Sequence, residues 1–188
     1  MQNYHKDESP LAKVFLSKLE VSPGGVTVAV KDLNVSRVSA GTPIGADSNG
    51  LYHVVKTAKI QATGSGTSYK LVKGHNFKVG DILASKAGKG YAIQSINTSN
   101  PEYDEVKVGT TLDTLNTGDV VFEGNTSSGS GVTFKYQPKA LVGTTFDVLA
   151  GDNHLKDAVL RGTVIEKNIA NVPFSKEIKD ALSHIIFN

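Results

Sequence analysis

The residues best able to do chemistry in this chain are its histidines and its closely spaced carboxylates. The histidines are far apart, and no two have the spacing that places a pair of metal ligands on one helix turn or strand face; they are His5, His53, His75, His154 and His184. The chain has no cysteine, which excludes thiolate zinc sites and a cysteine nucleophile. We therefore expect no metal and no other cofactor, and we interpret the histidines as surface residues.

Two acidic segments have simpler interpretations than metal binding or acid–base catalysis. The segment Asp47-Ser48-Asn49-Gly50 is similar to the start of a calcium loop, but Gly45 and Lys56 stand where that loop needs acidic ligands. It is predicted to be a β-turn with glycine at the positive-φ position. The other segment follows Pro101 and precedes a predicted strand, where solvent would keep its carboxylates ionised; these are Glu102, Asp104 and Glu105.

Motifs for nucleophilic catalysis and phosphate binding are missing from the sequence. There is no Gly-x-Ser-x-Gly elbow, which a hydrolase serine would need. Gly64-Ser65-Gly66 and Gly129-Ser130-Gly131 lack the further glycine and the lysine of a phosphate-binding loop. The sequence therefore predicts a protein that is not an enzyme.

Composition also argues against nucleic-acid and membrane partners. Of 20 basic residues only Arg37 and Arg161 are arginine, and the lysines are spread singly along the chain against 18 acidic residues. A nucleic-acid protein gathers such charges on one face. Met1–Pro10 is polar, unlike a secretory signal, and no run approaches the ~20 apolar residues of a membrane helix. We expect a protein kept in the cytoplasm or in a particle assembled there.

Short β-type segments separated by glycine-rich turns dominate the chain, which predicts a mainly β fold. Residues 11–21 and 26–30 are predicted to form a hairpin around the turn Ser22-Pro23-Gly24-Gly25. A strand is predicted over residues 51–60, and further strands over 92–96, 105–108, 120–123, 132–136, 145–149 and 159–165. Strands at this spacing indicate a small β-barrel or a sandwich built from hairpins.

One local pattern recurs: a glycine, then Thr or Asp, then any residue, then an apolar residue. It begins at Gly41, Gly80, Gly109, Gly118 and Gly143. The glycine is expected to take a left-handed turn conformation, and the Thr or Asp side chain to bond a nearby amide. We interpret these glycines as structural turn formers that lead the chain into a strand.

The predicted organisation has three parts. Residues 1–10 form a mobile arm, residues 11–170 a β-domain, and residues 171–188 a C-terminal amphipathic helix; a division of the β-domain into two lobes near 124–138 is left open. Ser175 is the predicted N-cap, and Ile178, Ala181, Leu182 and Ile185 share one helix face. The apolar end of the chain is a candidate subunit interface, made by Leu182, Ile185, Ile186 and Phe187.

The middle of the chain resembles a family of phage structural proteins. Gly41-Thr42-Pro43-Ile44 and Gly50-Leu51-Tyr52-His53 are similar to elements of capsid decoration proteins, and the segments 77–83, 92–96 and 103–106 to phage head-fiber proteins. The likeness runs from Val28 to Ile165. It implies a homotrimer on the capsid exterior of a tailed bacteriophage, with the major capsid protein as its partner. It implies no functional residue, because this family works through surfaces.

Two functions follow as expectations. The first is a structural virion protein that binds the outer capsid surface, as a decoration protein or a head fiber. The alternative is a carbohydrate- or receptor-binding β-module of a phage tail or baseplate. The absence of tryptophan from the sequence argues against a sugar site, although four tyrosines remain available for one: Tyr52, Tyr69, Tyr91 and Tyr103.

Overall fold

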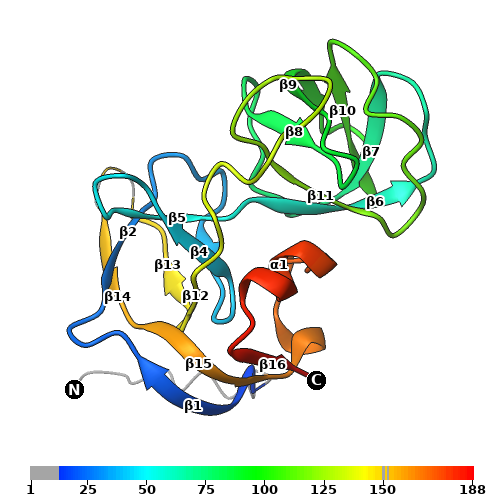
Figure 1. Ribbon diagram of the computed structural model, residues 1–188. Coiled ribbons are helices and arrows are strands. Elements are labelled where there is room, and N and C mark those ends of the chain that lie inside the picture. Colours follow the sequence, from blue (N-terminus) through cyan, green and yellow to red (C-terminus); the bar gives the residue numbers. More distant parts are fainter. Residues whose placement is uncertain (1–12, 150, 152) are drawn as a thin grey trace, which may run out of the picture.

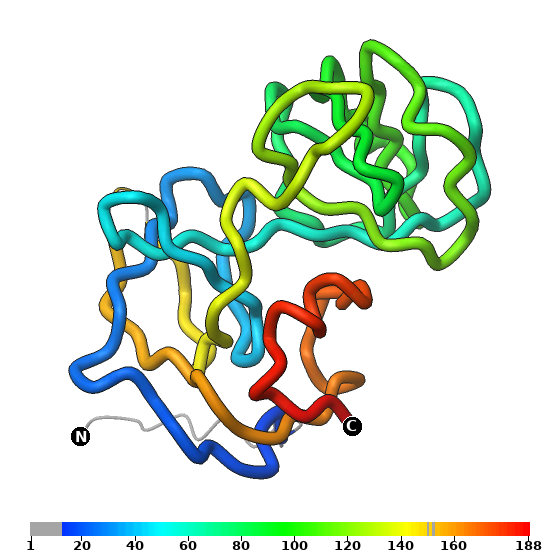
Figure 2. The backbone as a smooth tube through the Cα atoms, in the orientation of Figure 1, coloured from blue at the N-terminus to red at the C-terminus, as the bar shows by residue number. Residues whose placement is uncertain are grey.

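The computed structural model describes residues 13–149, 151 and 153–188, and the chain forms two β-rich lobes (Figure 1). The predicted arm over residues 1–10 lies outside the described residues. The mainly β fold with a barrel is confirmed, and a single α-helix lies near the C-terminus of the described part. The course of the backbone can be followed in Figure 2, where the middle of the chain forms one lobe and both of its ends meet in the other.

The first lobe is a closed barrel of six strands in the order β10-β7-β6-β11-β8-β9. Its strands are β6 (Thr57–Ala62), β7 (Ser68–Val72), β8 (Ile82–Ala84), β9 (Gly90–Asn97), β10 (Tyr103–Val108) and β11 (Val120–Glu123). Alternate side chains point inward and fill the barrel, which is why Tyr69, Leu71 and Val106 are buried. The barrel therefore has its own hydrophobic core and no strand edge left open.

The second lobe is a curled sheet in the order β1-β15-β12-β4-β5-β2-β14, with β16 added beside β15. A small separate sheet pairs β3 with β13. The strands are β1 (Phe15–Val21), β2 (Val26–Ala29), β3 (Arg37–Val38), β4 (Pro43–Ala46), β5 (Tyr52–Val54), β12 (Ala140–Val142), β13 (Phe146–Asp147), β14 (His154–Lys156), β15 (Ala158–Val164) and β16 (Ile185–Phe187). Unlike the barrel, this sheet has two end strands, β1 and β14, that each pair on one side only among the described strands.

The chain crosses between the lobes twice. It leaves the sheet lobe after β5, through Val55 and Lys56, and returns after β11 through residues 135–139. The first crossing lies inside the segment 51–60, so the prediction of one continuous strand there is wrong. The segment 132–136 is also not a strand; it contains one isolated bridge, between Phe134 and Gly124, and a few further backbone hydrogen bonds.

The first two strands form as predicted, but they do not pair with each other. The turn closes where expected, since the amide of Gly25 donates to the carbonyl of Ser22 at 3.0 Å. β1 then pairs with β15, and β2 pairs with β14 and β5. The predicted hairpin is wrong because the glycine turn reverses the chain without placing its two arms side by side.

Three of the five glycines of the recurring pattern have the predicted left-handed conformation, and two do not. Gly41, Gly80 and Gly118 have φ values of +85°, +95° and +92°, as predicted. Gly109 and Gly143 are outside the left-handed region. Gly143 is needed for a different reason, because a Cβ there would collide with the carboxylate of Asp157. The close approach of the Asp157 side chain therefore explains why position 143 is a glycine.

The C-terminal segment is a short helix followed by a strand. The Ser175 hydroxyl accepts a hydrogen bond from the amide of Ile178 and caps α1 (Lys176–Ala181), which a 3₁₀ turn, η1 (Glu166–Asn168), precedes. The helix stops at Leu182, and Ile185 already belongs to β16, parallel to β15. The predicted helix over 171–188 is therefore too long, because its last residues gain strand pairing instead of helix hydrogen bonds.

Candidate functional site

The histidines are more enclosed than the sequence suggested. His75 is buried, and the ring of His53 stacks on Tyr136 with centroids 4.0 Å apart. The interpretation of all the histidines as surface residues is therefore wrong for these two. In the described part of the chain, no three or more His, Cys, Asp or Glu side chains are grouped so that they could hold a metal ion.

The Asp47 turn has the predicted structure. The Asp47 carboxylate accepts hydrogen bonds from the amides of Asn49 and Leu51 at 2.8 and 2.9 Å, and Gly50 has φ +82°. Desolvation acts to raise the pKa of Asp47, but these amide bonds and the contact with His53 outweigh it and lower that pKa. The carboxylate is therefore an ionised turn former.

Asp104 is buried beside His75, contrary to the prediction of a solvated turn. Its carboxylate lies 2.6 Å from the Lys73 ammonium and 3.4 Å from Nε2 of His75. Nδ1 of His75 accepts a hydrogen bond from the amide of Phe77 at 3.2 Å, so the neutral ring carries its proton on Nε2, facing Asp104. Burial lowers the pKa of His75. No basic nitrogen is left to take a proton from a substrate, and the pair ties the loop 73–77 to β10.

Tyr69 does not offer an aromatic ring to a ligand. Its side chain fills the barrel core, and its hydroxyl accepts from the amide of Leu112 at 2.8 Å and donates to the carbonyl of Asp113 at 3.1 Å. Tyr69 is therefore removed from the four tyrosines suggested for a sugar site. The three others, Tyr52, Tyr91 and Tyr103, are half-buried.

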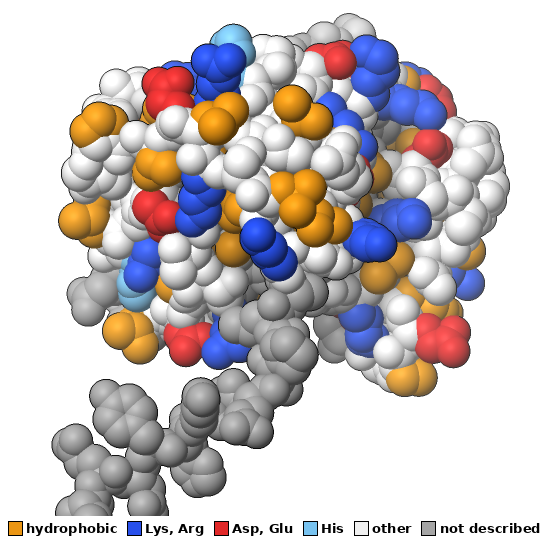
Figure 3. Space-filling model, turned by 90° about the horizontal axis from the view of Figure 1, so that it is seen from below, with side chains coloured by type: hydrophobic (Ala, Val, Ile, Leu, Met, Phe, Trp, Pro, Cys, Tyr) orange, Lys and Arg blue, Asp and Glu red, His pale blue; other side chains and the backbone are white. Residues whose placement is uncertain are grey.

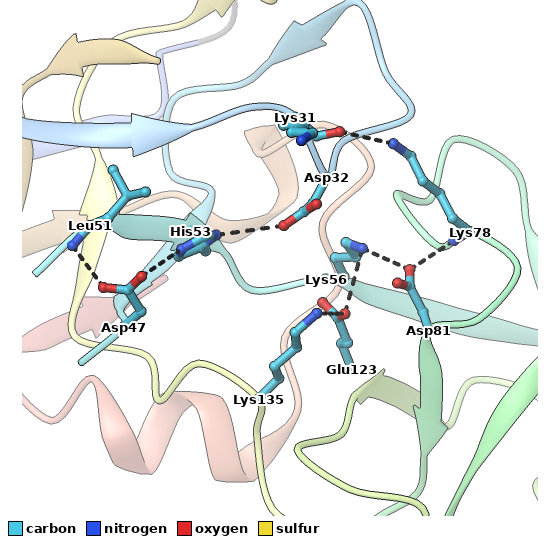
Figure 4. A network of polar contacts seen from close by, with 10 residues as sticks. All are labelled: Lys31, Asp32, Asp47, Leu51, His53, Lys56, Lys78, Asp81, Glu123 and Lys135. Carbon is cyan, nitrogen blue, oxygen red and sulfur yellow. Dashed lines mark hydrogen bonds and ion pairs between the residues drawn. The ribbon is translucent and has the colours of Figure 1, made fainter. Parts of the chain in front are cut away.

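A network of four charged side chains, two of which are buried, holds the junction between the lobes (Figure 4). The ammonium of Lys56, on the first crossing, lies 2.7 Å from Asp81 and 3.6 Å from Glu123. Lys135, on the second crossing, lies 2.6 Å from the same oxygen of Glu123. The side chains of Lys56 and Glu123 are only 2% and 3% exposed. Two cations thus balance two carboxylates at the point where both crossings meet.

Backbone hydrogen bonds join the same residues. The amide of Glu123 donates to the carbonyl of Lys56 at 3.0 Å, and the amide of Lys135 donates to the carbonyl of Glu123 at 2.9 Å. Burial raises the pKa of Glu123, although the ammonium groups of Lys135 and Lys56 act to lower it. This junction fixes the two crossings to each other. Both ammonium groups lie at Oε1 of Glu123, and its Oε2 is buried without a hydrogen-bond partner.

The strongest candidate for a binding surface is β1, an end strand of the large sheet. Among the described strands β1 pairs only with β15, so its outer edge faces no other described strand. Its register with β15 is irregular at several points, and the two residues of β1 that the register skips are Leu16 and Leu19. A β-bulge re-aims side chains, and here Leu16 and Leu19 are 47% and 68% exposed.

Ile186 is a further exposed apolar residue of the same sheet, on β16, which β15 separates from β1. Ser17, Thr163 and Ile186 stand in one register row across β1, β15 and β16, and Ile186 is 60% exposed. Figure 3 views the molecule from the side on which these strands lie in Figure 1, and it shows hydrophobic side chains interspersed with basic ones. We call Leu16, Leu19 and Ile186 the edge surface.

The residues predicted to form a subunit interface largely face their own lobe. Leu182 and Ile185 are buried in the core beside Phe15 and Ile178, and Phe187 packs against it. Of the four predicted residues only Ile186 is exposed. Sequence analysis missed the edge surface because its leucines lie in a segment that was expected to be a hairpin strand. One signal was available: Phe15-Leu16 and Leu19 break the alternation of apolar and polar residues in a regular strand.

No helix in the described ranges is long and apolar enough to cross a membrane. Comparison of the chain with protein-family models, with curated proteins and with solved structures gives no significant match.

Proposed function

We propose that this protein is a non-catalytic structural protein of a tailed bacteriophage, which assembles through the edge surface and binds the outside of the capsid. The observation that carries the proposal is the pair of bulged leucines on β1. A regular edge strand would not need to turn two leucines to solvent, and an open apolar edge is an aggregation hazard unless a partner covers it. Assembly supplies that partner.

The occupant of the edge surface is a second copy of this chain. β14, at the other end of the same sheet, pairs only with β2 among the described strands, and its Leu155 is 66% exposed. Because the two end strands differ, β1 of one subunit can contact β14 of the next in a head-to-tail manner. Such contacts form a closed ring when the rotation between neighbouring subunits is a whole fraction of a full turn. A ring of three would be the homotrimer that the resemblance to decoration and head-fiber proteins implies.

The ion pairs of the buried charged groups support a role without catalysis. Lys73 pairs with Asp104, and Lys56 pairs with Asp81 and Glu123. These pairs hold loops or lobes together, although Nε2 of His75 and Oε2 of Glu123 are buried without a hydrogen-bond partner. An active site needs such groups aimed at a substrate. The capsid as partner, and the virion exterior as location, rest on the resemblance over Val28–Ile165 together with the edge surface.

Leu19→Glu is expected to give a folded monomer that binds capsids at least tenfold more weakly. A carboxylate at the subunit contact would be buried without a partner, so the subunits should separate. The measurement is sedimentation of the recombinant protein with empty phage heads, together with its mass by light scattering. Val79→Glu is the matched control, because Val79 is 62% exposed on the other lobe.

Each outcome bears on a different part of the proposal. If Leu19→Glu assembles and sediments with heads like the wild type, the edge surface is not the contact. If the wild-type protein forms an oligomer but never sediments with heads, self-assembly stands and the capsid role is wrong.

A further inference from the structure

His75 lies where the barrel meets the sheet lobe. It belongs to the loop that follows β7, residues 73–77, which we call the His75 loop. Its side chain lines two cavities, of about 200 Å³ and about 310 Å³. The segment 169–173 of the sheet lobe contributes to the lining of the first cavity, and Asn34 of the same lobe contributes to that of the second. The His75 loop is therefore a contact between the two lobes.

Only the neutral form of the His75 ring fits this contact. Nδ1 accepts a hydrogen bond from the amide of Phe77 at 3.2 Å, so the single ring proton of the neutral form is on Nε2. Acid adds the second proton at Nδ1, where it would point at an N–H group that is itself a donor. Phe77 has no exposed surface and His75 is only 9% exposed, so the amide would lose its acceptor in a buried place. Protonation therefore requires the ring or the loop to move.

The carboxylate of Asp104 does not offset this loss. It lies 3.4 Å from Nε2, which carries its proton in both states, so acid adds no new donor toward it. The other carboxylate oxygen is already 2.6 Å from the Lys73 ammonium. The charged residues that line the two cavities with His75 are this one aspartate and three lysines, Lys59, Lys73 and Lys78. The surroundings thus hold more positive than negative charge, which opposes a further cation.

The barrel holds the His75 loop more firmly than the sheet lobe does. The side chain of Phe77 is part of the barrel core. On the other side, Gly74 packs on the side chain of Asn171, where an added Cβ would lie 2.9 Å from Nδ2, and Asn171 is exposed. A hydrogen bond from Nζ of Lys78 to the carbonyl of Lys31, at 3.2 Å, is exposed as well. A displaced loop would therefore separate from the sheet lobe and stay attached to the barrel.

We propose that the His75 loop is an acid-sensitive contact between the lobes, which packs against the segment 169–173 while the ring is neutral and separates from it when Nδ1 is protonated. The edge surface takes no part in this contact, so the proposal does not depend on the capsid role.

The direction of the pH dependence follows from the surroundings of the ring. Burial lowers the pKa of His75 below its ordinary value of 6.5; Asp104 acts to raise that pKa and Lys73 to lower it. A histidine whose folded pKa is lowered favours the closed loop above pH 6.5, and this preference is lost as pH falls from 6.5 through the folded pKa.

The test is a pH titration of the wild-type protein by NMR, with hydrogen exchange of the Phe77 amide measured on the same samples. The His75 ring should titrate below 6.5, and the signals of the Phe77 amide and of the Asn171 side-chain amide should move with the same midpoint. Protection of the Phe77 amide, corrected for the pH dependence of intrinsic exchange, should fall as the ring is protonated. The loss should reach about tenfold for each pH unit between 6.5 and that midpoint.

His75→Asn separates this contact from general effects of acid. The side-chain oxygen of asparagine can accept the amide two residues on, as Nδ1 of His75 does, but it does not titrate. We expect this variant to protect the Phe77 amide at neutral pH and to keep that protection in acid. His184→Asn is the control, because His184 is exposed and lines neither cavity, and it should lose protection as the wild type does.

Two results would overturn the proposal. One is a His75 ring that titrates while the Phe77 and Asn171 signals stay unchanged or follow a different midpoint. The other is a His75→Asn protein that protects the Phe77 amide at neutral pH and loses this protection in acid as the wild type does. If the variant does not protect Phe77 at neutral pH, the wild-type titration alone decides between the two accounts.

Discussion

Replacing Lys56 with methionine is expected to destabilise the folded protein by about 3–5 kcal/mol, the usual cost of removing one partner from a buried ion pair. Methionine keeps most of the side-chain volume, so the loss comes from the charge. Glu123 and Asp81 would then remain in the junction with Lys135 as their only cation in the network. Urea unfolding, followed by circular dichroism at one fixed protein concentration, measures the change.

The pH dependence of this loss identifies its cause. Burial raises the pKa of Glu123, and removal of the Lys56 ammonium should raise it further. A carboxylate whose folded pKa is raised favours the folded state at low pH, and this stability is lost as pH rises through the folded pKa. The deficit of Lys56→Met should therefore be smaller at about pH 5 than at about pH 8, and adding Glu123→Gln should recover part of it.

An exposed ion pair serves as the control for the junction. Lys176 and Asp180 are 2.6 Å apart, but their side chains are 82% and 61% exposed, so Lys176→Met should cost at most about 1 kcal/mol. Equal effects of the two lysine substitutions would contradict the structural role of the Lys56 network.

Leu182→Ala is expected to lower the free energy of unfolding by about 2–5 kcal/mol, as for other buried leucines. Leu182 is 3% exposed and lies in the core of its own lobe with Ile178 and Phe174. The subunits should stay associated, because this side chain has no surface left for a neighbour. Urea midpoints report the stability, and light scattering on the same samples reports the association.

Val79→Ala is the control for Leu182→Ala. Val79 is 62% exposed on the barrel lobe and outside the edge surface, so its truncation should change folding stability by no more than about 0.5 kcal/mol. A Leu182→Ala protein that keeps its urea midpoint but falls apart into monomers would show that Leu182 belongs to a subunit contact instead.

The sequence predicted many strands correctly because turn chemistry and β-branched runs are local signals. The turn at Ser22–Gly25 and the strand over residues 120–123 are examples. Strand partners were not predictable in the same way, since β1 pairs with β15 from the far end of the chain. Likewise nothing near Lys56 or Glu123 in the sequence indicates that the two meet, because only the return of the chain from the barrel brings them together.

The surfaces were harder to predict than the elements. Ile178, Leu182 and Ile185 were recognised as one apolar face, but a helical period cannot say what covers it, and their own lobe does. The leucines of β1 look like core residues in the sequence, and only the skipped register shows that they point outward.

The mass of the wild-type protein in solution tests the central claim, assembly through the edge surface, most directly. Light scattering coupled to size exclusion at micromolar concentration should give three times the chain mass of 19.9 kDa. Leu19→Glu should elute as a single chain in the same experiment. A wild-type protein that remains a strict monomer under these conditions would contradict the account.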